Sequence, residues 1–152
     1  MDARRRTRES LITEKKLSTY FQWDPAKLSL HVPEMDEEHQ ILVEKMNRLH
    51  ALREKGAPYA TVSQALDDFV RYTARHFADE EAYMERIGFP GLRVHRGVHR
   101  QLMDRLKEFR QAFEKTRTLP DDLFVFFKMW LSAHICGVDA KYAMHAQQAQ
   151  AV

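Results

Sequence analysis

The sequence predicts an all-α protein, an up-down-up-down antiparallel four-helix bundle preceded by an irregular N-terminal arm. Two observations predict this fold. Four segments carry apolar residues that step alternately by three and four positions, which is the seam spacing of helices that pack nearly antiparallel. Short connections of Gly, Pro and polar residues separate these segments, and no strand pattern competes with them.

The overall composition is that of one ordinary globular domain. The chain has 152 residues, of which 44% are hydrophobic and 30% are charged. Its formal net charge of +2 is too small to imply a nucleic-acid partner. A single cysteine, Cys136, excludes an internal disulfide and a cysteine-based metal cluster. We find neither a signal-peptide pattern nor a run approaching about 18 apolar residues, so we expect no membrane span and a cytoplasmic protein.

The segments outside the helices differ in character. Residues 1–20 are polar and basic, and we expect a solvated flexible tail there, with an anion-binding arm as the alternative. Residues 21–34 contain two prolines and alternate apolar with polar positions, which indicates an irregular arm packed on the bundle. The bundle as a whole is assigned to residues 21–145, and residues 146–152 to a C-terminal tail.

The helices themselves have recognisable starts and stops. We expect them to cover residues 36–54, 61–87, 92–115 and 120–145. Thr61 is expected to cap the second helix, and Gly88 to end it in a left-handed conformation. Pro120 suits the first turn of the fourth helix.

Histidine interrupts the apolar seam of every expected helix. A single histidine on such a stripe is usually a satisfied core residue, and a carboxylate there usually pairs with a base. Burying one unpaired polar group, however, costs roughly 1–3 kcal/mol, and a domain has only about 5–15 kcal/mol of net stability. A bound metal is the economical explanation, because neutral imidazole is a common metal ligand. The seam positions in question are His39, His76, Glu80, His95, His99 and His134.

Helical spacing brings these donors together in pairs. His95 and His99 are four residues apart, so both rings point to one side of the third helix. His76 and Glu80 have the same relation on the second helix. Such pairs at i and i+4 hold metal ions in other helical sites.

The fourth helix requires a different local geometry. Asp139 follows His134 by five residues, and five positions of an ideal helix turn the direction by about 140°, given 3.6 residues per turn. One extra residue in this turn, a π-bulge, would carry Asp139 to the seam position that Val138 would otherwise take. We therefore predict a π-bulge across residues 134–139, where Gly137 also lies. The alternative is that Asp139 is an exposed carboxylate on the outer face.

The donors are numerous enough for two metals. If Glu80 and Asp139 both bridge, the five histidines divide into three and two, and the metal with two histidines keeps an open position for a small molecule. Nitrogen-rich octahedral surroundings suit iron, with manganese, cobalt and zinc as alternatives.

These stretches resemble the hemerythrin family, in particular its single-domain bacterial members. The matching motifs are MDEEHQIL, HFADEE, HRGVH and HICGVD, and the arm WDPAKLSLHVPEMD also looks like the family's entry to the first helix. The resemblance covers about residues 21–145 and includes seven ligand positions in order.

The resemblance implies a non-haem centre of two iron ions, bridged by an oxo or hydroxo group, that binds dioxygen end-on at the two-histidine iron. By motif, three histidines would bind one iron, namely His95, His99 and His134. The other iron would take His39 and His76, and Glu80 and Asp139 would bridge. The family's apolar oxygen pocket would correspond to Phe77, Trp130, Leu131 and Ile135.

Reversible dioxygen binding, for storage, delivery or sensing, is the function we expect, and an oxygen-consuming enzyme is the partner that a carrier would supply. Five imidazoles with only two carboxylates favour oxygen carriage over the chemistry of carboxylate-rich oxygen-activating sites, so we do not expect an enzyme. The alternatives are handling of nitric oxide or peroxide, iron donation for repair of iron–sulfur centres, and a purely structural metal bundle. Cys136 is expected to be an inert buried thiol.

Overall fold

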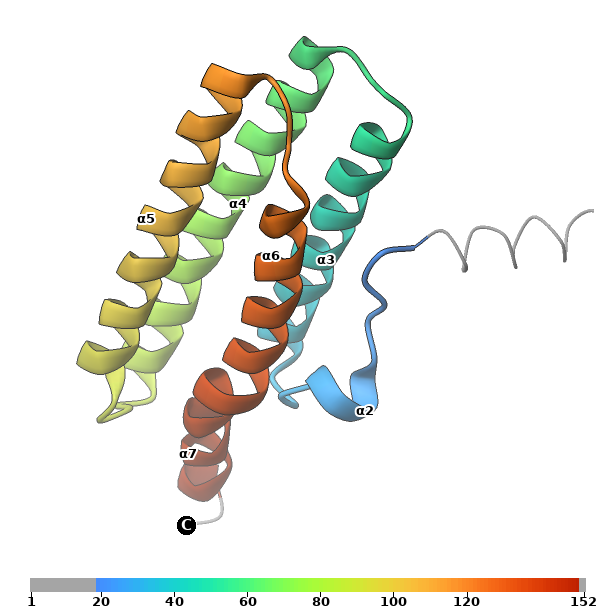
Figure 1. Ribbon diagram of the computed structural model, residues 1–152. Coiled ribbons are helices and arrows are strands. Elements are labelled where there is room, and N and C mark those ends of the chain that lie inside the picture. The colour runs from blue at the N-terminus through green and yellow to red at the C-terminus, as the bar shows by residue number, and fades with distance from the viewer. Residues whose placement is uncertain (1–18, 151–152) are drawn as a thin grey trace, which may run out of the picture.

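Four long helices run alternately up and down in the computed structural model, which describes residues 19–150 (Figure 1). All regular structure in this range is helical, as the seam spacing predicted. The last helix is continuous but contains a π-helical segment, η1. The elements are α2 (Pro25–Leu28), α3 (Pro33–Glu54), α4 (Tyr59–Arg86), α5 (Leu92–Thr116), α6 (Asp121–Ala133), η1 (His134–Asp139) and α7 (Ala140–Gln150).

The helix boundaries agree with the sequence to within a few residues, and one predicted cap is wrong. Helix α4 begins at Tyr59 with Pro58 as its N-cap, and no side chain caps it. Thr61 lies inside the first turn instead, where its N–H donates to the Pro58 carbonyl at 3.0 Å. Gly88 has a φ of +64°, so the predicted left-handed end of this helix is confirmed.

The C-terminal end is more regular than expected. Helix α7 continues to Gln150, so residues 146–150 are helical rather than part of a tail. This segment is rich in alanine and glutamine, which favour helix, and the buried Ala146 packs on the bundle. The predicted basic tail, apart from residues 19 and 20, lies outside the described residues.

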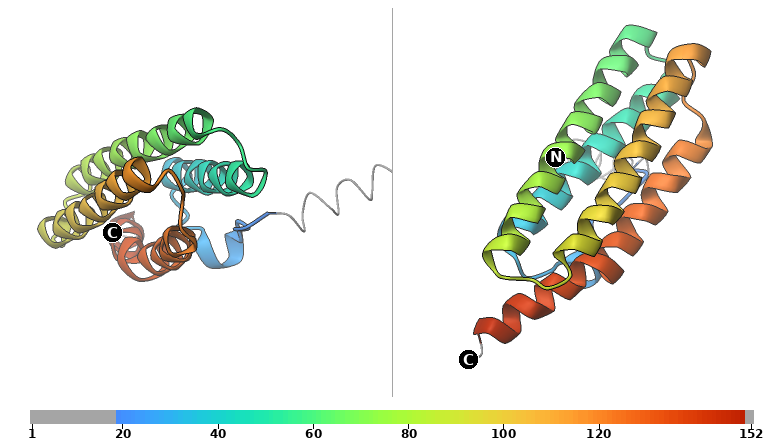
Figure 2. Two further views of the ribbon diagram at one scale, coloured as in Figure 1. Left: turned by 45° about the horizontal axis from the view of Figure 1, so that its top comes forward. Right: turned by 90° about the vertical axis from the view of Figure 1, so that its left-hand side faces the viewer.

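The N-terminal arm is fastened to the bundle by hydrogen bonds as well as by apolar burial. The Asn47 side chain on α3 accepts from the Phe21 N–H at 2.8 Å and donates to the Phe21 carbonyl at 2.7 Å. Asp36 accepts from the Ser29 hydroxyl at 2.6 Å and from the Leu30 N–H at 2.8 Å. The arm therefore follows a fixed path beside α3 to the lower part of the last helix, where α2 packs against η1 (Figures 1 and 2).

The helix that contains η1 is long and apolar. By length and composition alone, the run Asp121–Gln150 could cross a membrane. The sequence did not predict this, because polar residues interrupt the apolar ones in this helix. A core helix passes the same test. Here Leu123, Phe127 and Leu131 are buried at the centre of the bundle, together with residues of the other three helices.

Candidate metal centre

Seven polar side chains lie together in the half of the bundle that contains the start of α3 and the end of α4. They come from all four long helices, and each is only 0–4% exposed. The sequence singled out the same seven residues, and the structure brings all of them into one cluster. We call it the donor cluster: His39, His76, Glu80, His95, His99, His134 and Asp139.

The predicted π-bulge is confirmed and explains how Asp139 reaches the cluster. Residues His134–Asp139 form the π-helical segment η1. One extra residue in this turn places both end residues on the same side, and the Asp139 Oδ1 lies 3.0 Å from the His134 Nε2. The alternative of an exposed carboxylate is wrong, because Asp139 is completely buried.

Glu80 lies at the centre of the donor cluster and divides the histidines into two groups. Its Oε1 lies 3.0 Å from the His95 Nε2 and 2.9 Å from the His99 Nε2. Its Oε2 lies 3.5 Å from the His39 Nε2 and 3.4 Å from the His76 Nε2. The two oxygens of one carboxylate therefore face different pairs of imidazoles.

Asp139 repeats this division from the opposite side. Its Oδ1 lies 3.1 Å from the His95 Nε2 and, as above, close to His134, whereas its Oδ2 lies 3.2 Å from the His39 Nε2. Two ion-sized groups of donor atoms result, and both include Glu80. One group has five members, Glu80, His95, His99, His134 and Asp139, and the other has three, His39, His76 and Glu80.

Several donor atoms are close to one another without forming hydrogen bonds. The His39 Nε2 and both Asp139 oxygens are buried and have no hydrogen-bond partner among the described residues, although His39 and Asp139 approach to 3.2 Å. Their lone pairs converge on common points rather than on each other. Leaving such groups unsatisfied would cost about 1–3 kcal/mol each, so the arrangement fits bound cations.

A second layer of acidic and phenolic groups surrounds the donor cluster. The His76 Nδ1 lies 2.8 Å from the Glu38 Oε1, and the His99 Nδ1 lies 2.9 Å from the Glu81 Oε1. The Tyr142 hydroxyl donates to the Glu80 Oε2 at 2.9 Å. Carboxylates behind metal-binding histidines set the tautomer and ring orientation. Counting Glu80 and Asp139, four carboxylates match the charge of two divalent ions.

Sequence reasoning missed these three supporting residues. Glu38 and Glu81 each adjoin a donor in the motifs EEH and DEE, and that adjacency was the available signal. Tyr142 is three residues beyond Asp139 and fully buried, but its partner Glu80 is 62 residues away in the chain. No local pattern reveals a contact between residues so far apart.

Without metal, the carboxylates of the donor cluster raise the pKa values of its histidines. Burial alone lowers the pKa of His76, but hydrogen bonds to Glu38 and Glu80 outweigh it and raise the pKa to about 10. Burial likewise lowers the pKa of His134, and close contacts with the carboxylates of Asp139 and Glu80 raise it to about 9. The same contacts hold the pKa of Glu80 well below its usual range against the effect of burial. The carboxylates thus favour positive charge inside this core.

Apolar side chains cover one side of the imidazoles. The Phe77 ring stacks on the His99 ring, with centroids 3.9 Å apart and planes 9° apart. Trp130 meets Phe77 edge-on at 5.7 Å and lies 5.7 Å from the His134 ring. The other two expected pocket residues, Leu131 and Ile135, are buried on the helix that carries His134.

Cys136 differs from its sequence expectation. It is exposed rather than buried, and its thiol donates to the Lys27 carbonyl of the arm at 3.4 Å. The π-helical turn causes this difference, because it directs His134, Ile135 and Asp139 to the core and leaves the middle of the segment outside.

The fold and the donor cluster define a class of protein, a four-helix bundle whose core is built to hold a pair of metal ions through histidine and carboxylate. A family model described as Hemerythrin HHE cation binding domain matches residues 30–146. The chain therefore belongs to the hemerythrin family.

Individual relatives agree with this assignment. The chain is 34% identical over 116 residues to a bacteriohemerythrin of Stenotrophomonas maltophilia, covering 76% of this chain and 75% of the relative. It is 34% identical over 108 residues to a myohemerythrin of Riftia pachyptila, covering 71% and 79%. The crystal structure of wild-type hemerythrin matches with a TM-score of 0.76 at 25% identity, over 82% of this chain and 96% of that chain. The bacterial relatives place the chain with the bacterial members of the family.

Proposed function

We propose that this protein binds dioxygen reversibly at a centre of two iron ions, for oxygen storage, delivery or sensing. One observation carries the proposal: each bridging carboxylate presents its two oxygens to different groups of imidazoles. Such a carboxylate is suited to join two metals. Two ferrous ions would supply the two electrons that dioxygen takes up when it binds.

The residues at each metal would differ in number, and this difference has a chemical use. His95, His99 and His134 would bind one iron, and His39 and His76 the other. Glu80 and Asp139 would join them. The iron with two histidines would keep a position for a small ligand. Glu38 and Glu81 would hold the rings of His76 and His99 in a fixed orientation.

The apolar cover supports carriage rather than turnover. Loss of bound oxygen in a reduced, protonated form requires water and protons. Phe77, Leu131 and Ile135 are buried, and with Trp130 they would exclude both from the metals. Burial of all seven donors also argues against a function that releases iron routinely, such as donation to iron–sulfur centres.

Iron content and the visible spectrum test this proposal. We expect two irons per chain in protein purified with its native metal. After reduction without air, an absorption band should appear when oxygen is admitted and vanish when it is removed. Irreversible oxidation on first exposure would instead support peroxide or nitric oxide chemistry. Zinc in place of iron would refute the di-iron assignment.

A pair of variants links the spectrum to the two-histidine iron. His39→Asn should abolish the reversible band, because it removes one of only two imidazoles on the oxygen-binding iron. His50→Asn is the matched control on the same helix, since His50 stacks on Tyr20 outside the donor cluster. A band that survives in His39→Asn would contradict the assignment.

A further inference from the structure

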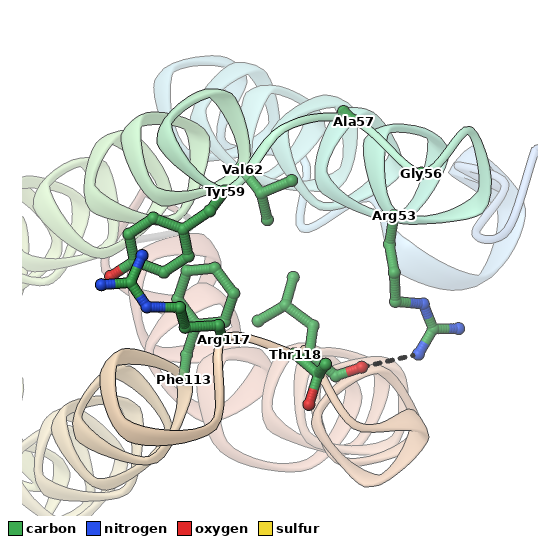
Figure 3. Close-up of a pocket in the computed structure, with 9 residues that line it drawn as sticks. Arg53, Gly56, Ala57, Tyr59, Val62, Phe113, Arg117 and Thr118 are labelled. Carbon is green, nitrogen blue, oxygen red and sulfur yellow. Dashed lines mark hydrogen bonds between the residues drawn. The ribbon is translucent and has the colours of Figure 1, made fainter.

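A cavity of about 350 Å³ lies at the other end of the bundle from the donor cluster, where the α3–α4 connection faces the α5–α6 connection (Figure 3). Its walls include Val62, Phe113 and Leu119, which are all buried. Two arginines, Arg53 and Arg117, also line it. Its volume falls in the range of small-molecule sites, and its apolar walls suit an apolar ligand body.

The charge of this cavity is one-sided. Two cations line it, and no acidic residue does. The groove between α3 and α4 differs, because it combines Arg48 and Arg71 with Asp68. The cavity at the bundle end therefore favours an anionic ligand over a neutral one or a cation.

Arg117 has an unusual backbone conformation, and its exposed side chain lies over an aromatic ring. Its φ is +58°, a left-handed conformation at the end of α5 that glycine adopts more easily. Its N–H donates to the Phe113 carbonyl at 2.8 Å, and its guanidinium lies 4.3 Å from the centre of the Tyr59 ring. Tyr59 in turn stacks on Phe113. The aromatic pair thus supports the guanidinium from one face.

The donors of Arg117 are available to a ligand. In the part of the chain that the structure describes, no carboxylate forms an ion pair with it. Stacking occupies the face of a guanidinium, whereas its five N–H donors lie in the plane and match a carboxylate in geometry. An arginine held in this way is prepared to bind an acid group.

Arg53 lies on the opposite side of the cavity from Arg117, as Figure 3 shows. One of its N–H groups donates to the Leu119 carbonyl at 3.3 Å, and its guanidinium lies over the Phe124 ring. Two carboxylates already pair with it, Asp121 at 2.7 Å and Glu54 at 3.0 Å. Arg117 is therefore the arginine of this cavity whose charge remains for a ligand.

We propose that this cavity binds a small organic acid with an apolar or aromatic body. The body packs against Val62, Phe113 and Leu119, and Arg117 holds the carboxylate. Aromatic monocarboxylates such as benzoate combine a carboxylate with an apolar body. Neutral analogues lack the charge, and inorganic phosphate lacks the apolar body.

Calorimetric titration of the metal-loaded protein with benzoate tests the proposal. We expect saturable binding of one benzoate per chain, no binding of the neutral isostere benzamide and none of inorganic phosphate. The visible spectrum of the metal centre should stay unchanged, because the cavity is at the other end of the bundle.

Variants assign the binding to this cavity. Arg117→Gln should weaken benzoate binding by about ten-fold or more, the loss expected for a charge-assisted hydrogen bond. Arg105→Gln is the matched control, because Arg105 stacks on Phe109 in the same way outside the cavity. Arg117→Gly should also weaken binding while its Tm stays equal or rises, since glycine adopts this backbone without strain.

Several outcomes would overturn the proposal. Absence of binding heat would do so, as would equal binding of benzamide or phosphate. Unchanged affinity in Arg117→Gln would place the ligand elsewhere. A spectral change on addition of benzoate, with affinity that is insensitive to Arg117, would show that the acid binds the metals instead.

Discussion

Glu38 and Glu81 each lie directly behind a histidine of the donor cluster, on α3 and α4. They contact the Nδ1 atoms of His76 and His99, whereas the Nε2 atoms of those rings face Glu80. A carboxylate on Nδ1 makes the imidazole a stronger donor at Nε2 and fixes the plane of the ring. Two residues that never touch a metal would therefore set the strength of two of its bonds.

At the residue scale we predict that Glu38→Gln and Glu81→Gln each lower metal affinity by about 10–100-fold, the usual effect of losing such a partner. Glutamine keeps the size of the side chain but removes its charge. Competition with a chelator of known affinity measures the change. Glu37→Gln is the control, because Glu37 is the exposed neighbour of Glu38. Equal affinity in all three variants would refute a supporting role.

Individual residues show which features could be predicted from the sequence and which could not. Six of the seven donors could be predicted because a polar residue on an apolar stripe is anomalous, and anomalies of this kind are visible in a linear sequence. Asp139 lies off the stripe of a regular helix, and its prediction depended on the π-bulge and on the resemblance to a family. Thr61 failed as a cap because the helix already begins two residues earlier, at Tyr59, with Pro58 as its N-cap. Tyr142 resembles any core aromatic, and its hydrogen bond to Glu80 depends on packing between distant helices.

Among the elements, η1 has the clearest link to the site. Its six residues connect two regular helices and place His134 and Asp139 on the same side. The five-residue spacing predicted this segment, because a regular helix cannot direct both side chains to one point. Its consequence for Cys136 was harder to foresee. Which residues of a π-turn face outward depends on where the turn sits against the arm.

At the element scale we predict the result of deleting Gly137. The deletion leaves four steps between the histidine and the aspartate, so a regular α-helix can form and keep both on the seam. The protein should stay folded, with equal or higher resistance to urea, because regular helix replaces a rare geometry. Metal affinity should fall, because the aspartate shifts relative to Glu80. Urea unfolding followed by circular dichroism and metal titration measure both effects.

A second deletion serves as the control. Removing the half-exposed Val125 from the regular helix α6 also shortens the chain by one residue. It rotates everything that follows by about 100° relative to the core, since each residue of an α-helix turns by that amount. This variant should lose both the fold and metal binding. If both deletions behaved alike, η1 would have no special role.

On the scale of the whole molecule, the donor cluster makes stability depend on pH. We expect the direction of this dependence to differ between the metal-free and the metal-loaded protein. In the metal-free protein, the pKa of His134 is raised from 6.5 to about 9 and that of His76 to about 10. A raised pKa gives stability that is fully present below pH 6.5 and is lost as pH climbs toward these values. With metal bound, the imidazoles must be neutral, so protons compete with the metal.

We therefore predict that the urea midpoint of the metal-free protein falls between pH 6.5 and pH 9, and that it rises or stays level in the metal-loaded protein. In acid, both forms should become less stable to urea as pH drops below about 4, because the histidine contacts of Glu80 and Asp139 depress the pKa values of these carboxyl groups. Urea titrations across this range, with and without chelator, measure the two slopes. Parallel slopes would mean that the cluster does not bind metal through these imidazoles.

The spread of the donors along the chain has a consequence for biosynthesis. The first donor is His39 and the last is Asp139, and every long helix contributes at least one. A growing polypeptide emerges from the ribosome N-terminus first. The half-site of His39, His76 and Glu80 is thus synthesised before the final helix. Capture of both ions has to wait for that helix, and an ion that arrives early meets an incomplete set of ligands.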